Sequence, residues 1–355
     1  MRRDRNVMLG FALAAALLLP TTSALAGPVG GQGEIFAKYY TNLGGLDGFQ
    51  VDANGNFAWN GPAGGDQVVR VAPAAGAGTP LAGPDGAPCK VVGTTVYCDI
   101  NRNGVWDGNA GGDLAANFSP GAGPGTILFA DLNGNGTDEL IKYVAGTPDF
   151  FQVDDNENNL WNGGAGGDRV INVAPGAGPG IPFVCDCDGN GTLEVGKYVA
   201  ATSTVYVDLN NNGVWDGNAG GDLAFSFAPG AGPGTFLFAN LGGTDAWEVI
   251  KYYASLGGID LFQIDLNNNQ AWNGAAGGDA AAVVAPAAGA GTPCAIDLDG
   301  DGVKVLCKTV AATSSIFVDA NGNRAWNGNA GGDASGAFAP GGGVGTFVIL
   351  QEPAP

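Results

Sequence analysis

One motif of fifteen residues recurs six times in this chain and constrains its fold more than any other feature. The motif is D-x-N-x-N-x-x-W-[ND]-G-x-A-G-G-D, and no copy contains a gap. The copies begin at Asp52, Asp99, Asp154, Asp208, Asp265 and Asp319. Units of this size cannot bury a hydrophobic core alone, so they must pack against one another. We therefore expect one repeat architecture, although a length of 355 residues by itself would suggest about two domains.

Short apolar segments surround each copy of the motif. In the third unit they cover residues 126–130, 139–145, 149–153 and 169–173, with clusters of Gly, Asn and Asp between them. Runs rich in β-branched and aromatic residues between such clusters predict strands. No segment after the N-terminal region has a helical period. Four short antiparallel strands per unit, repeated six times, predict an all-β fold, a six-bladed β-propeller.

The two ends of the chain predict how the ring closes. The first unit opens at residues 34–40, which match the second strand of the other units, so its first strand is missing. Residues 346–350 match that missing strand, for example 126–129 of the third unit. A closed ring brings these segments together and pairs both exposed edges. The expected repeats are approximately 31–78, 79–125, 126–180, 181–234, 235–291 and 292–345, with 346–355 as the closing strand of the first blade.

The N-terminal segment has the features of a secretory signal peptide. Arginines near the start precede an apolar run over 7–19, and residues 24–26 (Ala-Leu-Ala) form a small-x-small cleavage site. The run is too short to span a bilayer comfortably, and no second hydrophobic segment follows, so we expect no membrane span. We expect 1–26 to be removed and 27–355 to be secreted, periplasmic or located at the cell surface.

Charge and composition exclude several classes of function. The formal net charge is −20 and the chain contains no histidine. This acidity argues against nucleic acid as a partner, and it favours either cations as ligands or simply solubility. The absence of histidine excludes Ser-His and Cys-His nucleophile systems. Because the units are nearly uniform and none carries a distinct acid–base pair, we expect no enzymatic activity.

The six cysteines fit an oxidising compartment. Cys89 and Cys98 flank one loop, and Cys294 and Cys307 flank another, which predicts two hairpin disulfide bonds. The remaining two cysteines stand one residue apart in the fourth unit. They can be bonded to each other, free, or paired with another chain.

The motif also predicts a ligand. Oxygen-bearing side chains stand at positions 1, 3, 5 and 9, and a tight turn brings alternate residues to one side. Calcium accepts six to eight such oxygens, whereas zinc would require Cys or His. The bidentate Glu of an EF-hand is absent, so the Asp at position 15, main-chain carbonyls or water must replace it. The predicted ligands are Asp52, Asn54, Asn56, Asn60, Asp99, Asn101, Asn103, Asp107, Asp154, Asn156, Asn158, Asn162, Asp208, Asn210, Asn212, Asp216, Asp265, Asn267, Asn269, Asn273, Asp319, Asn321, Asn323 and Asn327.

A second set of predicted calcium ligands follows the first strand in three units. Its members are Asp131, Asn133, Asn135, Glu139, Asp186, Asp188, Asn190, Glu194, Asp297, Asp299 and Asp301. The last turn has Val305 where the others have Glu, and the pattern is too degenerate at 83–86 and 240–243 to predict a metal there. Loops after the first and third strands of an up-and-down blade leave the same end. We therefore expect both ligand sets on one face and the Gly/Ala connections on the other.

These motifs resemble the FG-GAP/VCBS repeats of extracellular propellers. The resemblance rests on residues 207–217 (V-D-L-N-N-N-G-V-W-D-G) and on the D-x-[DN]-G-[DN]-G turns at Asp131, Asp186 and Asp297. That family shares calcium-binding loop geometry with the integrin α-subunit propeller, so the resemblance implies a calcium-binding propeller. The family includes adhesins, lectins and enzyme accessory domains, and therefore implies no single biological role.

The loops also have an interpretation without metal, because Asp, Asn and Gly favour turns. The same register of oxygens in all six copies favours bound cations over turn formation alone. Extracellular calcium modules have dissociation constants of about 10⁻⁴–10⁻³ M. At millimolar calcium each site would add about 0.4–1.4 kcal/mol by mass action. We therefore expect structural calcium.

Two other residue types occur once per unit. The tryptophans either pack as wedges or form stacking platforms for sugars; they are Trp59, Trp106, Trp161, Trp215, Trp272 and Trp326. Trp247 lies outside this register and is expected to pack. The lysines of the second strands are expected to pair with neighbouring carboxylates, with ligand binding as the alternative; they are Lys38, Lys90, Lys142, Lys197, Lys251 and Lys308.

Together these features predict a secreted calcium-binding propeller that acts as a non-catalytic binding or structural module, with an extracellular protein or a glycan as partner. The alternatives are a calcium-dependent glycan-binding lectin and a polysaccharide-acting enzyme.

Overall fold

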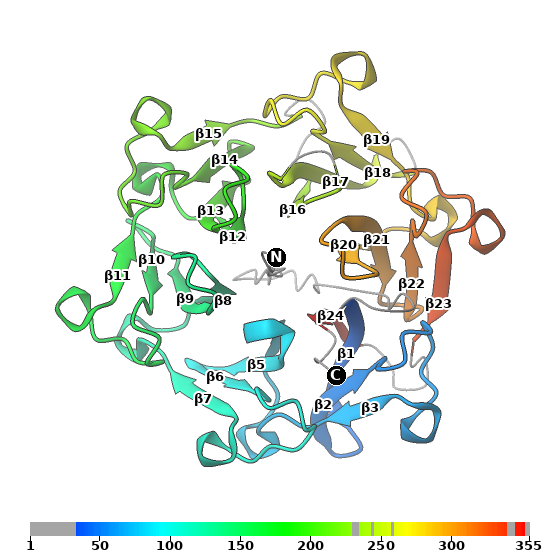
Figure 1. Ribbon diagram of the computed structural model, residues 1–355, viewed down its shortest axis with the longest axis horizontal. Coiled ribbons are helices and arrows are strands. Elements are labelled where there is room, and N and C mark those ends of the chain that lie inside the picture. Colours follow the sequence, from blue (N-terminus) through cyan, green and yellow to red (C-terminus); the bar gives the residue numbers. More distant parts are fainter. Residues whose placement is uncertain (1–32, 229–233, 243–244, 257–258, 339–344, 352–355) are drawn as a thin grey trace.

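The computed structural model describes residues 33–228, 234–242, 245–256, 259–338 and 345–351. These residues form six four-stranded antiparallel sheets that surround a central axis as blades (Figure 1). The predicted all-β, six-bladed propeller is therefore confirmed. The predicted signal peptide, residues 1–26, lies outside the described residues.

Each blade runs from an inner strand near the axis to an outer strand at the rim (Figure 1). Blade one consists of β24 (Thr346–Gln351), β1 (Glu34–Leu43), β2 (Leu46–Val51) and β3 (Gln67–Val69). Blade two consists of β4 (Thr79–Ala82), β5 (Pro88–Val92), β6 (Thr95–Cys98) and β7 (Leu114–Asn117). Blade three consists of β8 (Thr126–Ala130), β9 (Glu139–Val144), β10 (Phe150–Val153) and β11 (Arg169–Ile171).

The other three blades have the same order from the axis outwards. Blade four consists of β12 (Ile181–Cys185), β13 (Glu194–Val199), β14 (Thr204–Val207) and β15 (Leu223–Phe225). Blade five consists of β16 (Thr235–Ala239), β17 (Glu248–Leu256), β18 (Ile259–Ile264) and β19 (Ala280–Ala282). Blade six consists of β20 (Thr292–Asp297), β21 (Lys304–Val310), β22 (Ser315–Val318) and β23 (Ala334–Ala337).

The described helices are short 3-10 turns. One lies in each motif: η1 (Pro62–Gly64), η4 (Asn109–Gly111), η6 (Gly164–Gly166), η8 (Asn218–Gly220), η10 (Ala275–Gly277) and η12 (Asn329–Gly331). Others lie in connections: η2 (Pro73–Ala75), η3 (Pro84–Gly86), η5 (Pro120–Ala122), η7 (Pro175–Ala177) and η11 (Pro286–Ala288). Among the residues that the structure describes, no helix has the length and apolar character needed to cross a membrane.

The two ends of the chain meet in blade one, as the sequence predicts. Strand β24 pairs antiparallel with β1, with Ala37 opposite Val348. The rings of Phe36 and Phe347 meet edge to face at 6.0 Å, and both side chains are fully buried. The C-terminal strand therefore supplies the inner strand that the first unit lacks, and the ring is closed.

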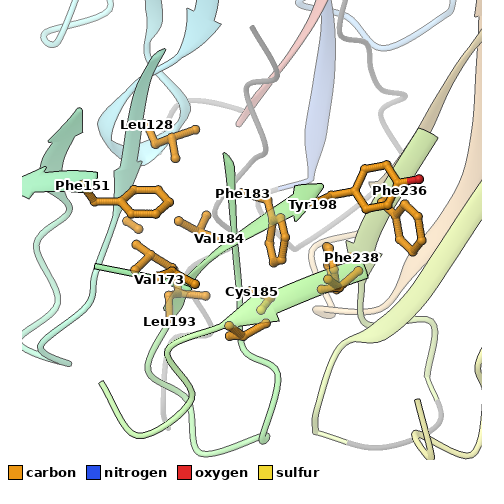
Figure 2. Packing of buried hydrophobic residues seen from close by; sticks show 14 of the residues in the cluster. Leu128, Phe151, Val173, Phe183, Val184, Cys185, Leu193, Tyr198, Phe236 and Phe238 are labelled. Carbon is orange, nitrogen blue, oxygen red and sulfur yellow. The ribbon is translucent and has the colours of Figure 1, made fainter. Parts of the chain in front are cut away.

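The hydrophobic core lies between neighbouring blades. The largest cluster joins blades three, four and five, and Figure 2 shows Phe183 of β12 beside Phe238 of β16. Their ring centroids are 4.2 Å apart, in a stacked arrangement. Gly196 of β13 faces Phe183 in the strand register, and a Cβ at this position would lie 2.3 Å from the ring carbon Cζ. Glycine at 196 thus makes room for the ring that fills the seam.

The blades associate in pairs at the rim. Parallel β-bridges join the outer edge of an odd-numbered blade to the motif loop of the next blade, and they connect Arg70 with Val105, Asn172 with Val214, and Val283 with Ala325. The described residues show no corresponding bridge from an even-numbered blade to the next. We call the units joined in this way blade pairs: one with two, three with four, and five with six.

The once-per-blade tryptophans follow the same alternation. In odd-numbered blades the indole meets a Phe of the preceding blade edge to face, as Trp161 meets Phe118 at 5.9 Å. In even-numbered blades it meets the aromatic residue of its own third strand, as Trp215 meets Tyr206 at 5.5 Å. The packing interpretation is confirmed for all six, and Trp247 is also buried.

All six cysteines form disulfide bonds. Cys89 pairs with Cys98 and Cys294 with Cys307, which confirms both hairpin predictions. The open question in the fourth unit is resolved, because its two cysteines are bonded to each other. Three disulfides suit an oxidising environment.

Candidate metal centres

The predicted ligands occupy two kinds of loop. We call residues 52–66, 99–113, 154–168, 208–222, 265–279 and 319–333 the W-loops, and residues 131–139, 186–194 and 297–305 the inner turns. The W-loops connect the third and fourth strands, and the inner turns connect the first and second.

Both kinds of loop lie on the same face of the propeller. Asn211 of the fourth W-loop donates hydrogen bonds to the main-chain oxygens of Leu132 and Leu193, in the inner turns of blades three and four, at 2.9 and 3.1 Å. In blade four the register sets Cys185 opposite Glu194 at the inner turn and Ile181 opposite Tyr198 at the other end. The Gly/Ala connection enters at that other end, so the predicted separation of the two loop types from the connections is confirmed.

Local hydrogen bonds explain why the W-loops contain Asn at positions 3 and 5. In the fourth loop, Oδ1 of Asn210 accepts the N–H of Asn212, and Oδ1 of Asn212 accepts the N–H of Val214. The Asn210 amide also donates to the carbonyl of Gly220 at 3.1 Å, which Asp could not do. Corresponding bonds occur in all six loops. Turn formation therefore accounts for these amides.

The same bonds fix the exposure of the predicted ligands. The Asp at position 1 is buried in every W-loop, whereas the side chains at positions 3, 5 and 9 are all exposed. The Asp at position 15 is buried as well, and Oδ2 of Asp222 accepts the N–H groups of Asp216 and Gly217. Each W-loop thus holds two buried carboxylates beneath an exposed rim of amide and carboxylate oxygens.

Unsatisfied oxygens distinguish the W-loops of blades two, four and six. In each, Oδ1 of the Asp at position 1 and Oδ1 of the Asp at position 15 are buried and accept no hydrogen bond; the pairs are Asp99 with Asp113, Asp208 with Asp222, and Asp319 with Asp333. Burial, and in addition the charge of Asp222, raises the pKa of Asp208 to about 6. A buried anionic oxygen without a donor is costly, and a cation bound between two of them removes that cost.

The odd-numbered blades fit a cation less well. In blade three, Asp154 accepts main-chain N–H groups with both oxygens, and Oδ1 of Asp168 accepts the Asn156 amide at 2.7 Å. In the W-loops of blades one and five, the position-15 carboxylates Asp66 and Asp279 keep an unsatisfied buried oxygen and the position-1 carboxylates do not. The sequence assigned the position-15 Asp only as a substitute ligand. The presence of this Asp in all six copies was the sequence signal that it could be a primary ligand.

The inner turns bring carboxylates together in two places. One ligand oxygen from each of Asp186, Asp188 and Glu194 lies within 4.8 Å of the others, and Asp297, Asp299 and Asp301 form an equivalent group. Oε1 of Glu194 is buried and accepts no hydrogen bond. Burial, together with the charges of Asp188 and Asp186, raises its pKa to about 9.

Blade three and blade six depart from that arrangement. In blade three the Asn133 amide donates to Oε1 of Glu139, while Asn135 bonds to Glu157 of the W-loop. In blade six Val305 takes the place of that acid, and a carboxylate of blade one contacts the turn across the ring junction without joining the group of three aspartates. Glu34, the first residue of β1, accepts the Asp297 N–H at 2.9 Å and pairs with Lys304 at 2.6 Å. Glu34 aligns with Glu139, since each begins the second strand of its blade. This alignment, which the sequence-based prediction did not use, was the signal that Glu34 lies near an inner turn.

The fold and these loops define a six-bladed propeller with acidic loops gathered on one face. No family model matches the chain, and no curated protein matches it. A solved structure of an Agrocybe aegerita lectin, described as specifically recognising non-reducing terminal N-acetylglucosamine, is 15% identical, with a TM-score of 0.43. The match covers 84% of this chain and 75% of the lectin chain.

Proposed function

We propose that this protein is a secreted calcium-binding propeller that acts as a non-catalytic binding or structural module. The observation that carries the proposal is the set of three buried aspartate pairs with unsatisfied oxygens in blades two, four and six. In each pair one oxygen of each carboxylate is buried without a donor and the two negative charges repel each other, so a divalent cation between them removes both costs.

The chemistry of the donors favours calcium. All of them are oxygens, which suits a hard cation, and the described loops contain no imidazole. Calcium tolerates uneven coordination and draws on carbonyl and amide oxygens, which the loop rim supplies, whereas magnesium requires near-octahedral geometry. In the fourth W-loop, calcium would supply the positive charge that neutralises the buried carboxylates and holds the loop together. Asp208 and Asp222 would bind the ion on its buried side, and the exposed amide oxygens of Asn210 and Asn212 would complete its coordination shell.

Thermal melting of the mature chain in calcium, magnesium or excess chelator tests the proposal. We expect a calcium-selective rise in melting temperature, because binding to the native state stabilises it by mass action. Elemental analysis of the purified protein should show calcium. Identical melting in calcium and chelator, with no metal in the sample, would contradict the calcium assignment and leave the fold intact.

Glycan binding is the second candidate function. The aliphatic side chains at position 7 in three W-loops, Val105, Leu160 and Val214, are 56–58% exposed and lie next to the exposed asparagine amides. Apolar surface beside amide donors and acceptors suits the C–H faces and hydroxyl groups of sugars. A glycan array with and without calcium tests this function, with Val214→Asp as the variant expected to lose binding. An array without signal would leave only a protein partner or a structural role.

A further inference from the structure

The inner turn of blade four contains two overlapping sets of ligand atoms. The sulfurs of Cys185 and Cys187 and a carboxylate oxygen of Glu194 lie within 4.8 Å of one another. Glu194 also belongs to the group with Asp186 and Asp188. Cys185 stands directly opposite Glu194 in the strand register, and the Cys187 N–H donates to its Oε2 at 2.8 Å. One buried carboxylate therefore lies between a sulfur pair and an aspartate pair.

Blade three shows what this turn looks like without those features. Ala130 and Leu132 stand where blade four has the two cysteines, and the Asn133 amide satisfies Oε1 of Glu139. Blade four has Asp188 in place of that asparagine, and a carboxylate cannot donate a hydrogen bond. Oε1 of Glu194 is consequently buried without a partner. The unsatisfied oxygen beside Asp186 and Asp188 points to a bound cation, and the two sulfurs lie in the same turn.

The disulfide between Cys185 and Cys187 should be easier to reduce than the other two. It joins residues 2 apart in sequence, compared with 9 and 13 for the other two disulfides. A smaller loop restricts the unfolded chain less, so such a bond contributes less stability. Cys187 is also partly exposed, whereas the cysteines of the other two disulfides are buried. An external dithiol can reach Cys187 first.

We propose that this turn is a redox-dependent cation site: the oxidised form offers Asp186, Asp188 and Glu194 to a hard cation, and the reduced form offers Cys185, Cys187 and Glu194 to a thiophilic divalent cation such as zinc. The oxidised half rests on the proposed calcium function, whereas the reduced half is independent of it. Thiolates are strong ligands for zinc and cadmium and weak ones for calcium, so opening the disulfide changes the preferred metal.

The reduction balances with a dithiol as the named reductant. One thiolate of the dithiol attacks Sγ of Cys187, which forms a mixed disulfide and releases the Cys185 thiolate. The second thiol of the reductant, as a thiolate, then attacks the first sulfur of the reductant, which is bonded to Cys187 in the mixed disulfide. This step releases the Cys187 thiolate. The dithiol leaves as a cyclic disulfide and the protein gains two electrons. The two thiols lose their protons when the metal binds.

Cadmium is the probe for the reduced state. The full chain is treated with a limited amount of dithiol, desalted without oxygen, and titrated with Cd²⁺ while the ultraviolet thiolate-to-metal charge-transfer band is recorded. We expect two free thiols, identified as Cys185 and Cys187 by alkylation and mass spectrometry, and one Cd²⁺ bound with that band. Zinc in large excess should compete with the cadmium, because thiolates favour the softer of the two ions. The oxidised protein should show no band.

Two variants make the test specific. C185A/C187L gives blade four the residues of blade three, and it should fold, lose only the small stability contributed by this short-loop disulfide, and show no band. Glu194→Gln keeps both thiols and should weaken cadmium binding by at least about tenfold, because mutation even of a residue that only hydrogen-bonds to a metal ligand lowers metal affinity by that factor. Selective reduction of another disulfide, or equal cadmium binding by the reduced protein and C185A/C187L, would overturn the proposal. A missing calcium shift with the cadmium band retained would reject only the hard-cation half.

Discussion

Lys197 of blade four forms a buried ion pair with Asp149 of blade three, with Nζ 2.7 Å from Oδ2 and side-chain exposures of 0% and 1%. The Tyr143 hydroxyl donates to the same carboxylate oxygen at 2.6 Å and accepts the Gly180 N–H at 2.8 Å. The ion pair recurs as Lys90 with Asp47 and as Lys308 with Asp260. In each case the pair joins the two members of a blade pair. For these three lysines the predicted carboxylate partner is confirmed.

The lysines between blade pairs have different partners, and the prediction is wrong for two of them. Lys142 donates to the carbonyls of Phe118 and Ser119, and Lys251 donates to those of Phe227 and Ala228. The third, Lys38, donates to the hydroxyl of Ser314 at 2.6 Å. The reason lies in the facing blades. Even-numbered blades have Thr or Ser where odd-numbered blades carry Asp near the start of the third strand, so the described residues set no such aspartate against Lys142 or Lys251.

The first prediction compares the interface within a blade pair with the interface between two blade pairs. Asp149→Asn should destabilise the protein by about 3–5 kcal/mol, because it leaves the buried Lys197 ammonium without its counter-charge. The matched variant Lys142→Met removes hydrogen bonds to two carbonyls and should cost about 1–3 kcal/mol. Denaturant unfolding of both variants measures the difference. Equal losses would show that the two kinds of interface are energetically alike.

The second prediction concerns the deeper ligand of a W-loop. Asp222→Asn retains an oxygen for the Asp216 N–H but removes one of two buried negative charges. In chelator the variant should be at least as stable as the natural protein, because it relieves repulsion of Asp208. In millimolar calcium it should lose the contribution of one site, about 0.4–1.4 kcal/mol.

Asp216→Asn is the control for that experiment, since position 9 is exposed and four of the six loops already have Asn there. It should leave the calcium response nearly unchanged. If Asp222→Asn is destabilising by the same amount in calcium and in chelator, the carboxylate serves the loop alone and the metal assignment fails.

The third prediction is a dependence on pH. Burial raises the pKa of Asp99, Asp208 and Asp319 to about 6, from an ordinary value of 3.8. Between these two values the native state binds more protons than the unfolded state, so the free energy of unfolding falls as the pH rises. In chelator the melting temperature should therefore decrease from about pH 4.5 to about pH 6.5 through these groups.

Calcium should reverse part of that decrease, because it binds the ionised carboxylates and competes with protons. The calcium-induced rise in melting temperature should consequently be larger near neutral pH than near pH 4.5. Melting curves over this range in both conditions test the linkage. A calcium shift that does not change with pH would argue against buried carboxylates as ligands.

The fourth prediction concerns ring closure. Phe347 is fully buried against Phe36, and Phe347→Ala should cost about 3–5 kcal/mol, the range for large-to-small changes in a core. Leu46→Ala is the control, because Leu46 is 48% exposed and should change stability by no more than about 0.5 kcal/mol. Chemical denaturation distinguishes the two. A small effect of Phe347→Ala would mean that blade one is stable without a firmly packed closing strand.

Repetition is why the sequence was so informative about this fold. Six copies of one motif give the number of blades, and the missing first strand near Glu34 gives the closure at Phe347. The disulfides of the second and sixth units follow from hairpin neighbours. All of these depend on the order of strands, which the chain displays directly.

The chemistry of the site was less accessible. Which oxygen of Asp208 lacks a donor depends on the direction of individual hydrogen bonds, which residue spacing does not reveal. The role of Glu34 depends on a junction between residues more than two hundred positions apart in the chain. The partners of Lys142 and Lys197 depend on which blade each one faces. These properties arise from packing, after the strands are in place.

The pairing of β24 with β1 also has a consequence for how the protein is made. Strand β1 is synthesised long before β24, so the edge of β1 stays open while the five blades between them are translated. Exposed strand edges recruit other chains. Pairing with β24 removes this hazard as soon as the ring closes.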